Sequence, residues 1–312
     1  MKKQIVSIVL AALLLAGAAS CSQPNSAAES SAPSQSLKDS LLPATPSVGS
    51  SSSRVPNNIP SSSQTDSSGA SGASSQAEAN QVVTLTFPEG ESLTEIFTAL
   101  EKNGVSTFAE LTDMAENYDY SYYPLIAAAP SSGRCYRLEG YLFPDTYDFY
   151  VGEKPQDAIG RFLRNAEARI TDSHRQRAAE MGYTIDQVLT VASLIQREGS
   201  NPNEVANIAA VIYNRLDAGM KLEMDATITY IEDDVIPCFT GDIDPFRALY
   251  NTYKCPALPA GPICNPGLTT IEAALYPSDA PYLYFCHDSS GSYYYASTYE
   301  EHEQNLQKAG IG

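Results

Sequence analysis

Apolar residues recur every three or four positions near the middle of the chain, starting at Ile185. Thr184 and Gln187 have the spacing of a helix-capping box, and Gly199 supplies a stop signal. This pattern predicts a short buried helix that ends beside the acidic residue Glu198. We expect burial beside apolar packing to raise the pKa of this carboxyl, which suits a general acid that works near neutral pH.

A second helix is predicted directly after this stop. Asn201, Pro202 and Glu204 follow the order of cap, first-turn proline and third-position glutamate. Apolar residues then share one helical face from 205 to 216, and Gly219 closes the pattern. The two predicted helices are therefore separated by a short break and followed by a polar turn.

The pattern before these helices predicts a strand and two shorter helices. Residues 81–86 alternate weakly between apolar and polar, which favours a strand. Ser92 with Glu95, and Thr107 with Glu110, have capping-box spacing. We therefore predict a strand–helix–helix unit at the start of the folded part.

The remaining pattern is more varied. Alternation over 138–142 predicts a second strand that ends at Pro144, and an amphipathic pattern over 155–181 predicts one long scaffold helix. Residues 250–267 contain too many prolines and glycines for a helix or sheet interior, so a rigid loop with ligand-facing polar atoms is predicted. Further elements are expected at 269–275 (helix), at 282–285 with 293–295 (hairpin), and around His302 (final helix).

The N-terminus has the composition of an export signal. Lys2 and Lys3 precede a short apolar run, and small residues then lead to Cys21. Small residues before a cysteine resemble the lipobox of bacterial lipoproteins, which implies a signal peptide over 1–21 and a lipid anchor on Cys21. Ala18 stands where leucine is usual, so ordinary cleavage or retention as a weak anchor stays open.

Composition and charge narrow the possible functions. Residues 22–80 are mostly Ser, Ala, Pro, Gln, Asn and Gly, which cannot offset chain entropy by burial, so we predict a disordered tether. The net charge is −18 and the only basic run lies in the signal, which argues against nucleic-acid partners. Cysteine spacings of metal-knuckle type are absent, so no metal or cofactor is expected, and Cys255 with Cys264 is the disulfide pair to test first.

Four sequence blocks together indicate a protein family, although each block alone is weak evidence. They are LEGYLFPDTYDF (138–149), ASLIQREG (192–199), NRLDAGMKLEMDATITY (214–230), and YNTY with LPAGPICNPG and PYLYF (250–285). Over about 81–305 the chain resembles the YceG-like endolytic murein transglycosylases, the MltG family. The resemblance implies an α+β fold with a small LysM-like βαα module at 81–133 and a mixed helical/β catalytic domain at 134–312. From the residues alone, a generic βαα packing unit remains the alternative for the first part.

The resemblance also implies a reaction. Family members cut the β-1,4 bond between N-acetylmuramic acid and N-acetylglucosamine without water, which leaves a 1,6-anhydromuramyl end. One carboxyl acts first as general acid and then as base. The family's catalytic glutamate falls on Glu198, whereas an earlier family glutamate is Gln196 here and cannot donate a proton in that role.

Other residues are expected around the substrate. The candidate substrate-binding residues are Glu139, Asn214, Asp225, Tyr250, Asn251, Thr252 and Asn265. Because the chain has no Trp, sugar stacking would fall to Tyr or Phe. Glu139 can equally pair with an arginine, Asn214 can cap a helix, and Asp225 can cap the helix that follows it.

Rival functions remain open. Glu139 or Asp225 as a second acid would make the protein a two-carboxylate muramidase. The turn at 222–227 departs from the family's LQTDPT pattern and Tyr293 replaces a family histidine, so a non-catalytic wall-binding lipoprotein is the second alternative. The expected partners are peptidoglycan glycan strands, wall-synthesis enzymes, and the membrane through the lipid on Cys21.

Overall fold

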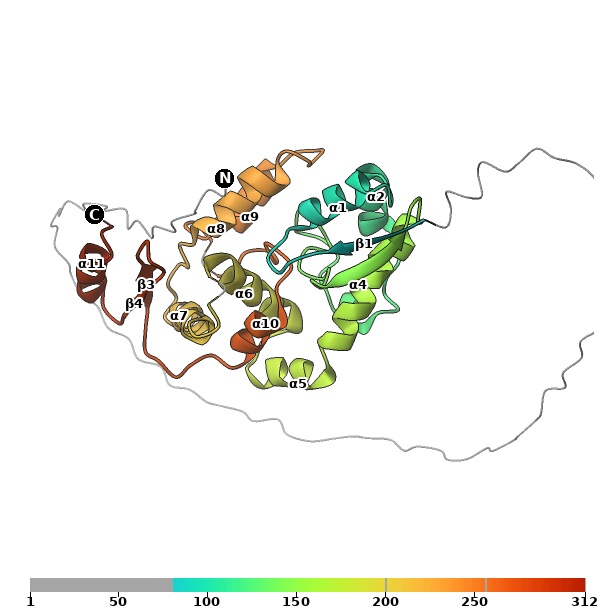
Figure 1. The fold of residues 1–312 in the computed structure, drawn as a ribbon. Coiled ribbons are helices and arrows are strands. Elements are labelled where there is room, and N and C mark those ends of the chain that lie inside the picture. The colour runs from blue at the N-terminus through green and yellow to red at the C-terminus, as the bar shows by residue number, and fades with distance from the viewer. Residues whose placement is uncertain (1–80, 200, 256, 312) are drawn as a thin grey trace, which may run out of the picture. The chain divides into compact units, whose positions relative to one another are not determined.

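The computed structural model describes residues 81–199, 201–255 and 257–311, all within one compact unit (Figure 1). The predicted signal, the tether and Cys21 lie outside these residues. The first elements in chain order are β1 (Val82–Thr86), α1 (Leu93–Lys102), α2 (Phe108–Asn117), α3 (Pro124–Ala127), β2 (Thr146–Tyr150), α4 (Pro155–Arg169) and α5 (Asp172–Glu180). The later elements are α6 (Ile185–Glu198), α7 (Val205–Asp217), α8 (Asp225–Thr229), the π-helical segment η2 (Tyr230–Val235), α9 (Asp244–Tyr250), α10 (Leu268–Leu275), β3 (Tyr284–His287), β4 (Tyr293–Ala296) and α11 (Tyr299–Lys308).

The helix starts that rest on capping boxes are confirmed. Ser92, Thr107 and Thr184 each accept a hydrogen bond from the backbone three residues on, at the starts of α1, α2 and α6. The second predicted helix begins later than expected, at Val205, because Asn201 forms a turn with its side-chain oxygen instead. Local side-chain bonds thus fix where each of these helices begins.

The strand predicted over 138–142 is wrong. Gly140 has φ +86° and packs so closely on Pro262 that a Cβ would lie 2.4 Å from its ring, so the chain turns there. Residues 138–143 are all buried, on both sides of the expected alternation, so this stretch is a buried turn and not a strand with one buried face. The strand instead follows Pro144, as β2.

The long helix predicted over 155–181 is divided in two. The chain leaves the helix at Ile170, and at the start of α5 the Thr171 N–H donates to Nδ1 of His174 at 3.2 Å. α4 buries six residues, whereas α5 buries only Ala178, so the apolar pattern that predicted the long helix in fact ends near Ile170.

Within the described residues, two small antiparallel sheets stand beside a larger number of helices, which confirms the α+β class. β1 pairs with β2 in the register Val82↔Tyr150, so a strand of the predicted LysM-like module pairs with one beyond the predicted boundary at residue 133. That boundary stays a prediction. The β3–β4 hairpin forms the second sheet, as predicted.

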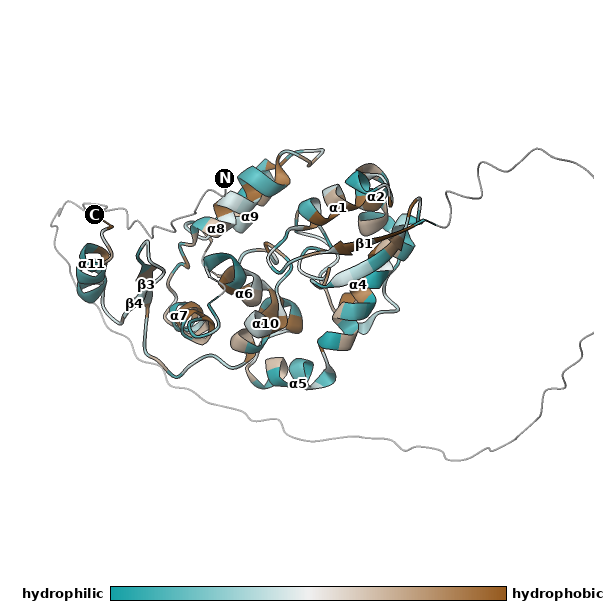
Figure 2. Cartoon of the chain, in the orientation of Figure 1, coloured by the Kyte–Doolittle hydropathy of each residue, from teal (hydrophilic) through white to brown (hydrophobic). Residues whose placement is uncertain are grey.

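α6 lies at the centre of the fold. It packs against α5, α7, α8 and α10, and Figure 2 shows hydrophobic residues on α7 and α10 while α5 and α11 are largely hydrophilic. Among the described residues no helix combines the length and apolar character that crossing a membrane requires. The core therefore holds α6 rigidly, with Glu198 at its last position.

The cysteine pair chosen for a first test does not form a disulfide. Cys255 and Cys264 are both free thiols, as are the other cysteines between residues 81 and 311. Cys264 is completely buried, where its Sγ donates to the Ser193 carbonyl at 3.5 Å, and burial raises its pKa to about 12. Cys255 lies on a partly exposed loop, so the two thiols occupy different environments.

Candidate active site

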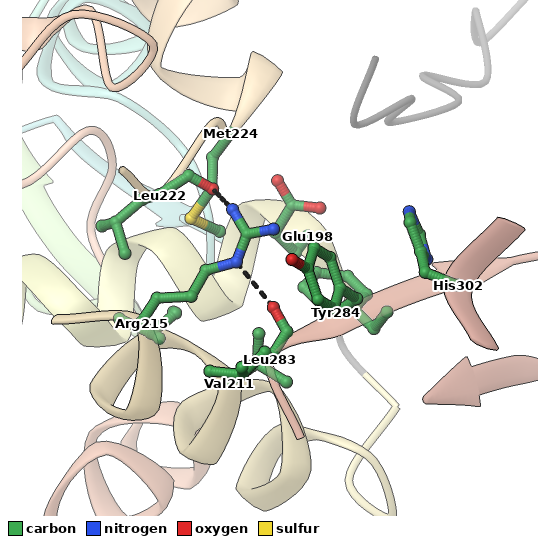
Figure 3. A pocket seen from close by; sticks show the side chains of 10 residues that line it. Glu198, Val211, Arg215, Leu222, Met224, Leu283, Tyr284 and His302 are labelled. Carbon is green, nitrogen blue, oxygen red and sulfur yellow. Dashed lines mark hydrogen bonds between the residues drawn. The ribbon is translucent and has the colours of Figure 1, made fainter. Parts of the chain in front are cut away.

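Glu198 lies in a mostly apolar pocket. Its residue is only 8% exposed, and Figure 3 shows its carboxylate directed toward the same space as the Arg215 guanidinium and the Tyr284 ring. The other lining residues are Val211, Ile212, Leu222, Met224, Leu283, Phe285 and His302. The cavity volume is about 10 Å³, enough for about one water molecule, so a sugar ring would lie across the mouth rather than inside.

The β3–β4 hairpin fastens the end of α6. The Tyr293 hydroxyl donates to the backbone carbonyl of Glu198 at 3.3 Å. A Cβ on Gly199 would lie 2.0 Å from that hydroxyl oxygen, so any larger residue at this helix stop would displace the Tyr293 side chain. Burial, followed by the charges of Glu198 and Glu204, raises the pKa of Tyr293. The residue that replaces a family histidine is therefore built into the support of Glu198.

Gln196 has a structural role in this region. Its Oε1 accepts from the Gly267 backbone N–H at 3.1 Å and from the Thr270 hydroxyl at 3.0 Å. These bonds join α6 to the first turn of α10. Glu198 lines the pocket, whereas Gln196 does not.

Arg215 forms the wall of the pocket opposite the helix end. Its Nε donates to the Leu283 carbonyl at 2.6 Å, and its Nη1 donates to the carbonyls of Lys221 and Leu222 at 2.9 and 3.0 Å (Figure 3). An ion pair of 3.2 Å joins it to Glu223. Arg215 therefore ties α7, β3 and the 221–223 turn together around the pocket.

The 221–225 turn has unusual backbone geometry. Glu223 has φ 56°, the one positive value at a non-glycine residue in the described part of the chain. Its N–H donates to the Thr252 carbonyl at 3.2 Å, and the Thr252 hydroxyl accepts from the Met224 N–H at 2.9 Å. Such conformations persist only where surrounding contacts over-determine them, and they concentrate at functional sites.

Asp225 pairs with a tyrosine that the sequence reasoning missed. The Tyr253 hydroxyl donates to Asp225 Oδ1 at 2.6 Å. Burial, this hydrogen bond, and the charges of Asp225, Glu223 and Glu198 raise the pKa of Tyr253. Tyr253 thus lies within electrostatic reach of Glu198 and Asp225 together. The signal that could have found it is the last letter of the YNTY block.

The three residues before Tyr253 occupy different surroundings. Tyr250 and Thr252 are completely buried, and Thr252 also lies 3.1 Å from the Thr227 hydroxyl at the start of the α8 region. Asn251 keeps partial exposure in a separate hollow of 310 Å³, and its Oδ1 accepts from the Tyr253 N–H at 3.0 Å. The loop therefore shapes the turn beside the pocket, and of these three only Asn251 keeps surface for a substrate.

The remaining candidates serve the scaffold in this structure. Glu139 is completely buried and accepts hydrogen bonds from the Leu93 N–H (3.0 Å), the Tyr230 hydroxyl (3.1 Å) and the Asn265 amide (3.2 Å). Asn265 is 1% exposed. Asn214 donates to the carbonyls of residues 280 and 282, which positions the segment before β3. The structure does not bring Glu139 or Asn265 to the Glu198 pocket.

Burial raises the pKa of Glu139 to about 8, against an ordinary value of 4.5. The folded state therefore binds this proton more tightly than the unfolded chain, so the contribution to stability is full below about pH 4.5 and is lost as pH rises to about 8. The parent chain should lose unfolding free energy as pH rises from 5 to 8. In Glu139→Gln this loss should be smaller by on the order of 2 kcal/mol. Denaturant unfolding across this range measures it.

A matched control for that experiment is Glu110→Gln. Hydrogen bonds from Thr107 lower the pKa of Glu110, so this group titrates below the tested range and its replacement should leave the slope unchanged. A Glu139→Gln variant with the same pH dependence as the parent chain would show that the buried carboxyl does not titrate in this window.

Known proteins resemble this chain in sequence and in fold. A model of the YceG-like family matches residues 64–308. The chain is 29% identical over 259 residues to a Streptococcus pneumoniae protein named endolytic murein transglycosylase, which covers 75% of this chain and 46% of that protein. A Bacillus subtilis protein of the same name is 34% identical over 174 residues, which covers 55% of this chain and 48% of that protein. The chain spans about half the length of these curated relatives.

A solved structure is also similar. The crystal structure of a yceG-like protein from Listeria monocytogenes matches with a TM-score of 0.61 and 28% sequence identity, covering 71% of this chain and 75% of that one. The fold is therefore shared over most of the described residues. Since the family model spans most of the sequence as well, the chain belongs to the YceG-like family.

Proposed function

We propose that the protein is an endolytic lytic transglycosylase of peptidoglycan. In this proposal it cuts the β-1,4 bond between N-acetylmuramic acid and N-acetylglucosamine and leaves a 1,6-anhydromuramyl end. The observation that carries the proposal is the placement of Glu198, a nearly buried carboxyl at the end of a rigid core helix in a mostly apolar pocket. The relatives named endolytic murein transglycosylase support the same reading.

One carboxyl is sufficient for both proton transfers. In the first step the Glu198 carboxyl donates its proton to the leaving glycosidic oxygen as the bond to C1 of muramic acid breaks. In the second step the Glu198 carboxylate takes the proton of the C6 hydroxyl, whose oxygen bonds to C1. The proton returns to Glu198 and no water is consumed.

Asp225 is the candidate group for stabilising the positive charge that develops at C1. A carboxylate held in place lowers the energy of an adjacent cationic transition state because it needs no reorganisation during the reaction. The Tyr253 hydroxyl, 2.6 Å from Asp225 Oδ1, is the contact that holds it. Tyr253 is thus a positioning residue in this mechanism, because it holds the Asp225 carboxylate in place.

Tyr253→Phe removes that contact and is expected to lower kcat by about ten- to a hundredfold, since one charge-assisted hydrogen bond contributes roughly 1.5–3 kcal/mol. The thermal midpoint should stay within a few degrees. Tyr250→Phe is the matched control, because among the described residues the buried Tyr250 hydroxyl has no hydrogen-bond partner. Equal kcat in the Tyr253→Phe and parent enzymes would remove Asp225 positioning from the mechanism.

One observation favours a second candidate function. Tyr253 lies close enough to both Glu198 and Asp225 for their charges to raise its pKa. Two carboxyls near one site would suit a muramidase that adds water. Digestion of purified glycan strands separates the candidates by their product ends. Anhydro ends support the transglycosylase, reducing ends support the muramidase, and strand binding without fragments supports a wall-binding protein.

The proposal extends to location and partners. The export signal and the small residues before Cys21 support an extracytoplasmic protein held to the membrane by a lipid. Peptidoglycan strands are then its substrate, and wall-synthesis enzymes are further partners. Metabolic labelling with a fatty acid tests the anchor, because Cys21→Ala should abolish incorporation if the proposal is right.

A further inference from the structure

The Glu198 pocket is too small for a sugar ring but large enough for a substituent of one. Its volume is about 10 Å³, and of the ten described residues that line it, six are aliphatic, Met or Phe. These six are Val211, Ile212, Leu222, Met224, Leu283 and Phe285. A space of this size and character suits a single methyl group, which is comparable in size to one water molecule but needs no hydrogen-bond partners.

Two walls of the pocket belong to the packed core. Val211 and Ile212 are buried residues of α7, and Leu222 and Met224 are buried residues of the turn before α8. The Met224 N–H donates to the Thr252 hydroxyl at 2.9 Å, which holds this turn in place. A group that enters the pocket therefore meets walls that already have their shape, so little free energy is lost by ordering them.

An aromatic ring forms a third wall. The guanidinium carbon of Arg215 lies 5.0 Å from the centroid of the Tyr284 ring, and the His302 ring stacks on Tyr284 with the two centroids 5.2 Å apart. Figure 3 shows Tyr284 between these two side chains. Packing from both sides fixes the orientation of the ring, which limits how far the pocket can widen.

The bond that the proposed function cuts has one methyl-bearing substituent directly beside it. Glu198 must come within hydrogen-bond reach of the oxygen between C1 of N-acetylmuramic acid and C4 of N-acetylglucosamine. C2 of the muramic acid, next to C1, carries an acetamido group. On the other sugar, the carbons next to C4 carry a hydroxyl and a hydroxymethyl group, and the lactyl methyl of muramic acid is attached through C3, one carbon further away. Because Glu198 lines the pocket, the acetamido methyl is the one that reaches it most directly.

We propose that the Glu198 pocket binds the methyl of the 2-acetamido group of muramic acid, and that it thereby selects strands that are N-acetylated at this sugar. This rests on the proposed function. A small apolar pocket discriminates by one carbon in each direction, because a missing methyl leaves it unfilled and an additional carbon does not fit. Such discrimination amounts to about ten- to two-hundredfold in kcat/KM. Binding the methyl also holds C1 beside the Glu198 carboxyl, so the same contact positions the bond to be cut.

The first test compares purified strands that differ only in the acyl group on nitrogen. De-N-acetylated strands are re-acylated with formyl, acetyl or propionyl groups, so the amide is present in all three and only the number of carbons changes. For the parent chain, kcat/KM with acetyl strands should exceed that with formyl strands and that with propionyl strands by at least about tenfold. Formyl strands cut as fast as acetyl strands would overturn the proposal, and this is the result expected if the lactyl methyl fills the pocket instead.

The second test enlarges the pocket with Val211→Ala, at a wall that Figure 3 shows. The ratio of kcat/KM for propionyl strands to that for acetyl strands should rise about tenfold. Val205→Ala is the matched control, because Val205 is buried in the same helix but does not line the pocket, and it should leave the ratio unchanged. Each ratio compares two substrates on one preparation, so partial loss of folded protein cancels. An unchanged ratio in Val211→Ala contradicts the proposal, and if that variant does not fold, Ile212→Val decides.

Failure of the proposed function gives a different result. A parent chain that cuts none of the three kinds of strand overturns the proposed function and this inference with it. A parent chain that cuts all three at equal rates keeps the proposed function and overturns only the role of the pocket in selecting the acetamido methyl.

Discussion

Glu198→Gln is expected to lower the rate of strand cleavage on the order of a thousandfold, the share that a positioned general acid contributes. Glutamine has nearly the same shape but holds no proton to donate to the leaving oxygen. Because Glu198 ends a core helix and its carbonyl is held by Tyr293, the substitution should leave the fold and strand binding intact. Cleavage of purified strands, followed by release of soluble fragments, measures the loss.

The matched control for this variant is Glu204→Gln. Glu204 lies six residues further on and accepts from the Tyr295 hydroxyl at 2.9 Å, a bond that a glutamine oxygen can replace. It does not line the Glu198 pocket, so its variant should cut at the parental rate. Loss of activity in both variants would point to damage at the helix break, and full activity in Glu198→Gln would remove this residue from the chemistry.

Arg215→Met is expected to lower the free energy of unfolding by about 3 kcal/mol, because carbonyls at residues 221, 222 and 283 lose their donor inside the protein. Arg215 is 3% exposed, so water cannot easily take its place. The melting point should fall by roughly 6–12 °C. Activity should fall as well, since the turn beside Glu198 loses its tie to β3. Calorimetry and strand cleavage on the same preparation measure both effects.

Two variants make this result specific. Arg215→Lys keeps one charge on a flexible stem and should recover only part of the stability, since an ammonium cannot reach all three carbonyls in Arg's planar geometry. Arg247→Met removes a cation that is 41% exposed and pairs with Glu232 at the surface, so it should cost less than about 1 kcal/mol. An Arg215→Met variant as stable as Arg247→Met would show that the buried network contributes little.

Local signals predicted the elements best. The capping boxes at Ser92, Thr107 and Thr184 involve residues three apart, so the sequence contains all of the interacting groups. The turn at Gly140 depends on Pro262, more than a hundred residues away, and its buried neighbours imitated a strand. Patterns of burial therefore identified core segments reliably but not always their geometry.

The candidate site was predictable only in part. Glu198 was predicted from a sequence motif, and in the structure it lines a pocket. Thr252 and Asn265 were expected at a substrate surface, yet their polar groups satisfy buried backbone groups instead, which a proline-rich sequence does not reveal. The bond from Tyr253 to Asp225 spans 28 residues and depends on how the loop folds back. Long-range pairing of this kind needs the three-dimensional structure.

The central claim is that Glu198 drives cleavage without water. It is tested most directly by mass spectrometry of strand ends produced by the parent chain in water labelled with heavy oxygen. We expect muramyl ends that are one water lighter than a reducing sugar, carry no label, and disappear with Glu198→Gln. Reducing ends that carry the label would contradict it.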